Sequence, residues 1–143
     1  MNKKHLIFFV FILSMLLIPT GINSQKEDLV KECMTDIRPP FIVGDRSMKA
    51  FLTGDEVAEF RTTLFDGNTY RIILCTFEEK LMEFSIYDTN RNLLFNSSEF
   101  GHTGMWDFQM EGSMECIIEA RLNNEIAQSG MAMLLIGFKH SRE

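Results

Sequence analysis

The sequence is poor in the residues that mark metal and hydrolase sites. It has three cysteines and three histidines in 143 residues, without a CxxC pair or a Cys/His cluster, so neither a structural zinc site nor any other metal or cofactor is expected. The GxSxG motif of α/β-hydrolases is missing as well. Its 14 basic residues are outnumbered by 20 acidic ones. This balance disfavours nucleic acid and anionic membranes as partners, because phosphate binding requires Lys and Arg.

What the sequence does contain is the layout of a secretory signal peptide at its N-terminus. Lys3 and Lys4 precede an almost unbroken apolar run over residues 6–18, then a Pro-Thr-Gly break and the small residue Ser24. The run is shorter than the roughly 20 residues that span a bilayer. We expect cleavage after Ser24, which removes residues 1–24 and leaves 25–143 as one periplasmic or secreted domain without stable membrane insertion. An uncleaved N-terminal anchor is the alternative.

Residues 26–37 predict one short amphipathic helix. Its apolar side chains fall on one face at helical spacing: Leu29, Val30, Cys33, Met34 and Ile37. Pro39-Pro40 ends the segment, because proline has no N–H and restricts the residue before it. The apolar stripe of this helix requires a surface to cover.

After Phe41 the pattern changes to alternation, which predicts about eight short strands. The strand candidates are 47–52, 58–64, 70–75, 82–87, 93–95, 106–110, 114–122 and 131–138. Asp66-Gly67 is a strong hairpin-turn signal between two of them. Residues 131–138 lack alternation, as expected of a central strand buried on both faces. We therefore predict an all-β antiparallel sandwich of jelly-roll type with one N-terminal helix, and a small closed barrel as the alternative.

One loop combines an imidazole, an acid and aromatic rings. Residues 97–106 include Glu99, Phe100 and His102 and end at Trp106. The functional interpretation is a ligand-binding loop with an aromatic platform. The simpler interpretation is an exposed loop histidine, because connecting segments run over the surface.

Two further groups of residues look like a catalytic triad and a calcium loop, but neither is interpreted as a functional site. Ser98, His102 and Asp107 are close in sequence, but a catalytic triad is defined by geometry and not by spacing. Residues 88–92 alternate Asp and Asn like a calcium loop, yet Leu93 occupies the sixth position, where an EF-hand requires Gly. A turn between two strands explains that segment. No catalytic residue is therefore assigned.

The cysteines leave the pairing open. Cys116 alternates inward on its strand, which predicts a buried free thiol. Cys33 lies on the helix stripe and Cys75 lies beside Ile73 on an apolar outer face. Docking the helix there would favour a Cys33–Cys75 disulfide, and three reduced thiols are the alternative.

Several short motifs in the sequence are similar to motifs of a known family. Residues 56–72 give a strand, a turn and a strand with Tyr70, and Tyr87-Asp88 is followed after four residues by Leu93-Leu94. Over residues 47–139 this resembles the pre-peptidase C-terminal domain of secreted bacterial peptidases. Phrases at 50–56, 87–95 and 134–139 are similar to those of small exported β-sandwich proteins of unknown function from Bacteroidetes-type bacteria. The resemblance implies the fold, export and a Gram-negative periplasm or exterior, and it adds no catalytic residue.

Two functional hypotheses follow from the sequence. The first is an exported, non-enzymatic β-sandwich that binds a protein or a glycan of the cell envelope. The second is a small hydrolase or a hydrolase inhibitor whose site lies in the 97–106 loop.

Overall fold

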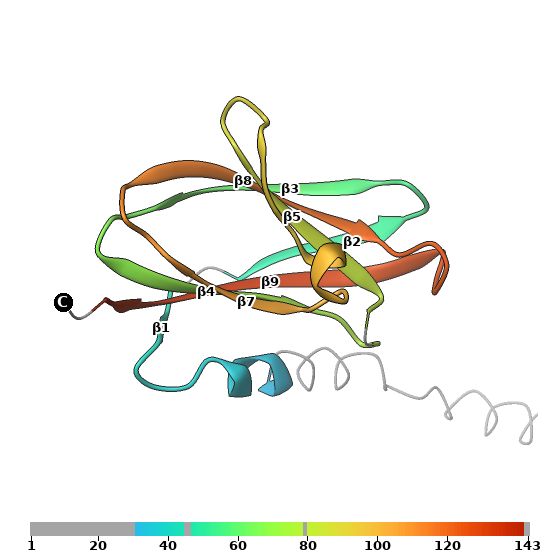
Figure 1. Ribbon diagram of the computed structural model, residues 1–143. Helices are drawn as coiled ribbons and strands as arrows, with labels where there is room; N and C mark the ends of the chain where they lie inside the picture. The colour runs from blue at the N-terminus through green and yellow to red at the C-terminus, as the bar shows by residue number, and fades with distance from the viewer. Residues whose placement is uncertain (1–30, 45–46, 79, 142–143) are drawn as a thin grey trace, which may run out of the picture.

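Two antiparallel sheets pack face to face in the computed structural model, which describes residues 31–44, 47–78 and 80–141 (Figure 1). Sheet A holds β1 (Ile42–Val43), β2 (Met48–Thr53), β9 (Ser129–His140), β4 (Asn68–Cys75) and β7 (Met105–Gln109). Sheet B holds β3 (Val57–Leu64), β8 (Met114–Leu122), β5 (Met82–Asp88) and β6 (Leu93–Asn96). The predicted β-sandwich is confirmed. Because the two sheets are separate, the alternative of a small closed barrel is wrong. The two-residue β1 was not predicted.

The core lies between the sheets and follows the alternation of the sequence. Its inward side chains include Ile72, Phe84, Ile118 and Leu134, all of them inaccessible to solvent. Cys116 is fully buried among them as a free thiol. Burial raises its pKa to about 11, and the nearby Glu115 carboxylate adds to the shift.

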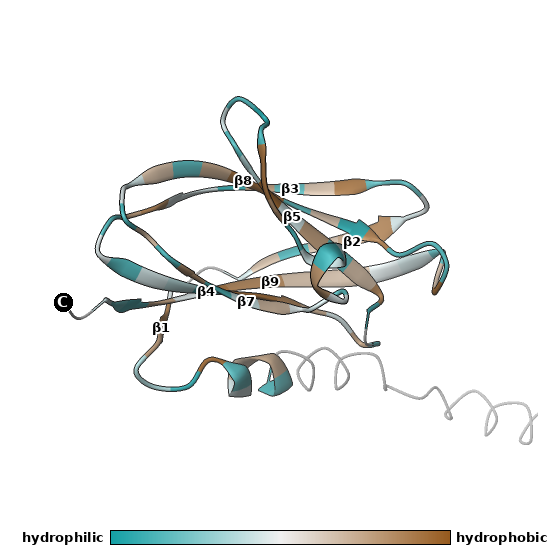
Figure 2. Ribbon diagram, viewed as in Figure 1, coloured by the Kyte–Doolittle hydropathy of each residue, from teal (hydrophilic) through white to brown (hydrophobic). Residues whose placement is uncertain are grey.

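Strand β9 is central and is buried on both faces, as its unbroken apolar run predicted. It pairs with β4 on one side and with β1 and β2 on the other. Ala132 and Leu134 face the core between the sheets, whereas Met133 and Leu135 face outward into a second apolar cluster. Figure 2 shows the apolar stretch in the middle of β9 and the hydrophilic loop that joins β5 to β6.

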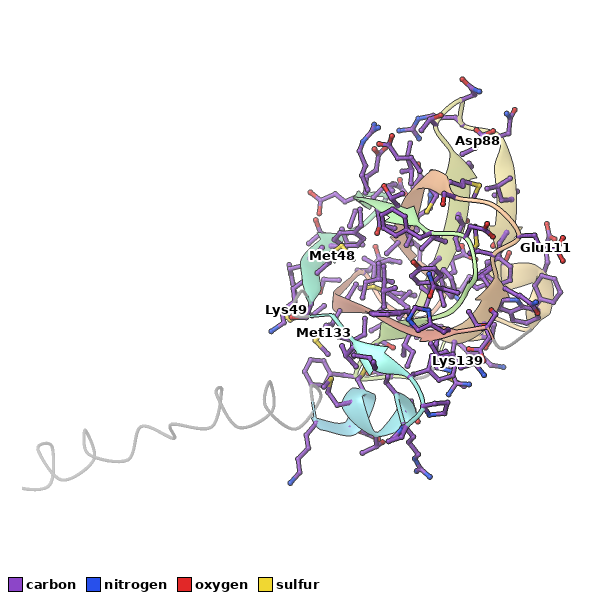
Figure 3. The ribbon with its side chains drawn as sticks, turned by 90° about the vertical axis from the view of Figure 1, so that its left-hand side faces the viewer. Met48, Lys49, Asp88, Glu111, Met133 and Lys139 are labelled. Carbon is purple, nitrogen blue, oxygen red and sulfur yellow. A yellow bond between two sulfur atoms is a disulfide. The ribbon has the colours of Figure 1, made fainter. Side chains whose placement is uncertain are left out.

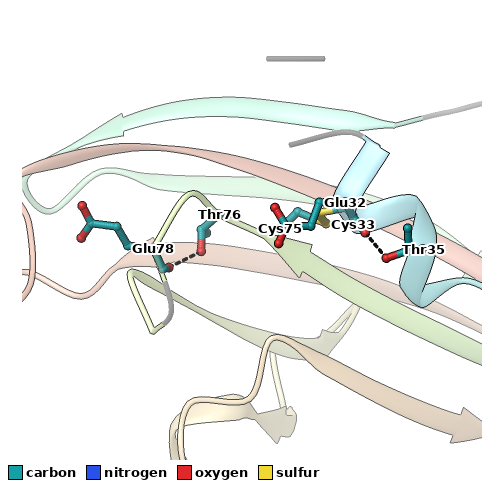
Figure 4. The surroundings of a disulfide bond; sticks show 6 residues. All are labelled: Glu32, Cys33, Thr35, Cys75, Thr76 and Glu78. Carbon is teal, nitrogen blue, oxygen red and sulfur yellow. Dashed lines mark hydrogen bonds between the residues drawn. A yellow bond between two sulfur atoms is a disulfide. The ribbon is translucent and has the colours of Figure 1, made fainter. Parts of the chain in front are cut away.

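The second cluster is covered by the N-terminal segment. Residues 31–36 are helical. The part of the predicted helix over 26–30 and the predicted signal peptide lie outside the described residues. Cys33, Ile37 and Phe41 are buried there against the outer face of sheet A. Cys33 is joined by a disulfide to Cys75, the pair that the sequence analysis favoured, with a Cα–Cα distance of 5.9 Å (Figure 4). In Figure 3 the helical segment and Asp88 lie on opposite sides of the sandwich.

The hairpin predicted at Asp66-Gly67 is wrong. Strand β3 pairs with β8, whereas β4 pairs with β9 and β7, so this turn joins the two sheets. Asp66-Gly67 does form a turn, in which Gly67 has a positive φ of 72°. The corner is held by other bonds: the Phe65 amide donates to the Tyr70 hydroxyl at 2.9 Å, and Asn68 Nδ2 donates to the Phe65 and Asp66 carbonyls.

Candidate functional site

The loop singled out in the sequence closes one open side of the sandwich, where edge strands β6 and β7 face each other. It begins with a 3-10 turn, η1 (Ser97–Phe100), capped by Asn96, whose side chain accepts from the Ser98 amide at 3.0 Å. Ser97 is fully buried and its hydroxyl accepts from the Phe84 amide at 2.9 Å. At the other end the Leu74 amide donates to the Gly104 carbonyl at 2.7 Å. The loop is therefore tied to both sheets.

Aromatic rings converge on this side of the molecule. Phe100 stacks on Phe95 at 5.3 Å with the planes 5° apart, and its ring centroid lies 4.5 Å from that of Trp106. Phe95 also contacts Phe84 and Phe108. Phe100 keeps 49% of its surface exposed, whereas Phe95 is buried. We call Phe95, Phe100 and Trp106 the aromatic ridge.

The structure brings together only part of the predicted loop site. Phe100 and Trp106 are in contact, and Glu99 is exposed on η1 beside them. His102 instead lies on the far side of Gly101, with positive φ (56°) and its Nδ1 at 3.6 Å from Glu83 Oε2. Trp106 is partly buried against the core.

A concave site that the sequence did not reveal lies next to this loop. We call it the disulfide cleft; it has a volume of about 430 Å³ and lies between the helical segment, the β4–β5 connection and residues 102–105. Its lining includes Glu32, Asp36, Phe77, Lys80, His102 and Met105. Ile73, Met82 and the Cys33–Cys75 disulfide also line it. These residues are far apart in the chain, so no local motif could have shown their proximity.

Charged side chains also meet on the outer face of sheet B. Glu119 is only 3% exposed, although it lies on the outward side of β8. Arg91, from the β5–β6 loop with φ 63°, donates to Glu119 Oε1 at 2.6 Å and also to Glu59. Arg121 donates to Glu119 Oε2 at 3.0 Å. This ion-pair cluster ties the β5–β6 loop, which projects from sheet B in Figure 1, to strands β3 and β8.

The catalytic and calcium arrangements considered above are not assembled. Asp107 is engaged in two 2.7 Å hydrogen bonds from Arg71, and the Ser98 hydroxyl donates to Asn96, so neither turns to His102. The Asp88 carboxylate accepts hydrogen bonds from the Asn92 side chain and amide and from the Asn90 amide, and these bonds lower its pKa. Within residues 31–44, 47–78 and 80–141 no group of three or more His, Cys, Asp or Glu could hold a metal ion.

Taken together, these features define an all-β sandwich with a disulfide-bound N-terminal segment, an aromatic ridge on its open side and a cleft beside it. In the part of the chain that the structure describes, no helix has the length and apolar character to cross a membrane.

The fold is similar to that of PliG from Aeromonas hydrophila, which is described as a periplasmic lysozyme inhibitor of g-type lysozyme. The TM-score is 0.51, the sequences are 12% identical, and the match covers 66% of this chain and 85% of PliG. At this identity the likeness shows the fold alone. No family model matches the sequence, and no curated protein does either.

Proposed function

We propose that this protein is an exported, non-enzymatic binding protein whose partner is a protein, and that the partner is a hydrolase that it inhibits. The similarity in fold to a lysozyme inhibitor favours this class of partner. The signal-peptide layout supports export, and so does the disulfide, because such bonds persist in oxidising compartments.

The observation that carries the proposal is the half-exposed Phe100 ring. It is stacked on Phe95 and in contact with Trp106, so it is held in place before any partner arrives. Rigid aromatic side chains with little conformational entropy to lose are frequent hot spots of protein interfaces. Phe100 would thus serve as the anchor that a partner covers.

Charge supports a basic partner. The sequence has a formal net charge of −6, and acidic surfaces accelerate association with basic proteins and slow it with acidic ones. Such complementarity contributes more to association rate and choice of partner than to affinity.

The proposal is tested by titrating the purified protein into assays of g-type lysozyme and a panel of peptidoglycan hydrolases and peptidases. We expect dose-dependent inhibition of at least one enzyme. Phe100→Ala should weaken that inhibition at least about tenfold, the equivalent of 1.4 kcal/mol. Phe65→Ala is the matched control, because Phe65 is 58% exposed at the β3–β4 corner, outside the ridge. Thermal unfolding of both variants verifies the fold.

Two results would contradict the proposal. The first is the absence of inhibition across the panel, with binding to purified peptidoglycan instead, which would favour the envelope-glycan hypothesis. The second is turnover of a peptide or peptidoglycan substrate by the protein itself, abolished by His102→Ala, which would make it an enzyme.

A further inference from the structure

Strand β3 is a free edge of sheet B. In the described part of the chain only β8 pairs with it, over eight consecutive positions without a register shift. Alternate residues of an antiparallel strand direct their N–H and C=O groups to opposite sides, so half of the β3 residues present backbone groups that no neighbouring strand takes up. The strand has no Pro and no bulge, which are two of the devices that keep natural edges from pairing. It is therefore open to another strand.

The other edges of the two sheets are shorter or blunted. Strand β6 has four residues and a register shift against β5. Strand β7 has five, and the Thr103 hydroxyl donates to the Met105 carbonyl and accepts from its amide. Strands β1 and β2 share one side of β9, and the last amide of β2, that of Thr53, donates to the Glu56 carboxylate at 2.8 Å. Of these edges β3 is the longest and the least protected.

Charge makes this edge complementary to a second copy of itself. Phe60 packs on the core, so the exposed Glu59 and Arg61 on either side of it point to the outer face of the sheet. When two β3 strands pair antiparallel about a twofold axis at Phe60, each Glu59 lies opposite Arg61 of the other copy. An axis at Glu59 or at Arg61 would oppose two acids or two bases, which is unfavourable. An axis between two residues would set inward side chains against outward ones.

Both charged groups are available for this pairing. Arg91 donates to Glu59 Oε1, which leaves Oε2 for another donor. The hydrogen bond from Arg91 and the nearby charge of Arg61 lower the pKa of Glu59, so its carboxylate is ionised at neutral pH. Arg61 is exposed, and within residues 31–44, 47–78 and 80–141 its guanidinium donates to no other side chain.

We propose that two copies of this chain pair antiparallel through their β3 strands, with the twofold axis at Phe60, so that the two copies of sheet B form one continuous sheet. Backbone hydrogen bonds and the pairing of the two half-buried Phe60 rings across the axis supply the affinity. The Glu59–Arg61 pairs fix the register, because exposed ion pairs contribute more to specificity than to stability.

This dimer leaves the aromatic ridge uncovered. Strands β3 and β6 are at opposite edges of sheet B, and Phe95 of the ridge lies on β6. The dimer therefore presents two Phe100 rings, one on each copy. The inference does not rest on the proposed function, but the two together make the protein bivalent toward its partner, which raises its avidity without any new contact.

Sedimentation of the purified protein over a range of concentrations tests the dimer. We expect a dimer with a Kd below about 0.1 mM. Arg61→Glu opposes acids at both ends of the pairing and Glu59→Arg opposes bases, so each should raise the Kd at least about tenfold. An equimolar mixture of the two variants should dimerise again, since every acid then lies opposite a base. Lys31→Glu is the control: it makes the same change of charge at an exposed residue of the helical segment and should leave the Kd unchanged.

Thermal unfolding verifies the fold of each variant, in particular Glu59→Arg, which loses the bond from Arg91; if that variant does not fold, Arg61→Glu alone decides. A protein that is monomeric at about 0.1 mM, or a dimer that Arg61→Glu leaves intact, would overturn the proposal. Loss of the dimer in Phe100→Ala would place the interface at the ridge instead. If the protein is monomeric and Arg61→Glu weakens inhibition of an enzyme, the edge receives a strand of the partner, and the proposed function stands without the dimer.

Discussion

Glu119 is an acid on the outward side of β8, yet the structure gives it the exposure of a core residue. Arg91 and Arg121 each donate to one of its carboxylate oxygens. Hydrogen bonds to charged groups contribute more than neutral ones, and their loss leaves a buried acceptor poorly satisfied. A single residue thus connects the β5–β6 loop to the sheet beneath it.

Glu119→Gln should lower the free energy of unfolding by about 1–2 kcal/mol, because a neutral amide cannot accept from both arginines with the same strength. Half of each arginine side chain is in solvent, which limits the effect. Chemical denaturation measures it. Glu115→Gln is the control on the same strand and face, where Glu115 is exposed, and should change stability by less than about 0.5 kcal/mol. Equal effects of the two variants would refute the special role of Glu119.

Asp88 makes the order of the β5–β6 loop depend on pH. The hydrogen bonds from Asn92 and Asn90 lower the pKa of its carboxyl. A lowered pKa in the folded state means that the stabilisation is present above the ordinary value of about 3.9 and is lost as the pH falls through the lowered value. The Asn90 and Asn92 amide resonances should therefore titrate with a midpoint below about 3.9. In Asp88→Asn the same resonances should not move over this range.

At the scale of elements, the segment over residues 31–43 acts as a cover for sheet A. Ile37 lies so close to Gly137 that a Cβ on that glycine would approach its Cγ2 to 2.9 Å. Arg71 and Lys139 lie over the Phe41 ring at 4.4 and 4.9 Å, contacts that add cation–π attraction. Packing and the disulfide together keep the apolar outer face of β4 and β9 out of water.

Removing the disulfide should destabilise the protein by about 4 kcal/mol in the chain-entropy model, since the two cysteines are 42 positions apart. Cys33→Ser/Cys75→Ala, compared with the unmodified protein by denaturation, measures the loss. The variant should also be cleaved more rapidly by trypsin after Arg38, because the cover opens more often. Unchanged stability and proteolysis would show that packing alone holds the segment.

Local pattern predicted which segments are strands but not how all of them pair. The alternation in β3, β4, β5 and β8 identified their inward faces, because one face of each strand must be apolar to form the core. Asp66-Gly67 was assigned to a hairpin because its turn chemistry is local. The choice of pairing partner, in contrast, depends on residues fifty or more positions away, as in the pairing of Leu64 with Met114. A turn between sheets and a hairpin turn require the same residues.

At the scale of the whole molecule, the secretory layout of residues 1–24 predicts export. We predict that the exported protein begins at Gln25, since Ser24 supplies the small residue at the cleavage site. N-terminal sequencing or intact mass of the protein from the cell envelope measures this, allowing for pyroglutamate at Gln25. Recovery from membranes of a form that retains Met1 would support the uncleaved anchor.

The candidate site was only partly predictable for the same reason as the pairing. Phe100 and Trp106 were recognised as aromatic residues of one loop, but their contact with Phe95 exists only because β6 and β7 end on the same open side. No local pattern singled out Glu32 and Asp36. Their place in a cleft depends on the docking of that helix beside Met105.

The buried thiol of Cys116 gives the protein an internal reporter of its opening reactions. Solvent does not reach the sulfur, and a pKa near 11 leaves little thiolate at pH 8. A disulfide reagent such as dithionitrobenzoate can therefore react only with molecules whose two sheets have separated. When reclosing is faster than reaction, the labelling rate divided by that of a free cysteine equals the open fraction. That ratio yields the free energy of opening in native buffer, without denaturant. Immediate labelling of the folded protein would instead show that Cys116 on β8 is accessible without separation of the sheets.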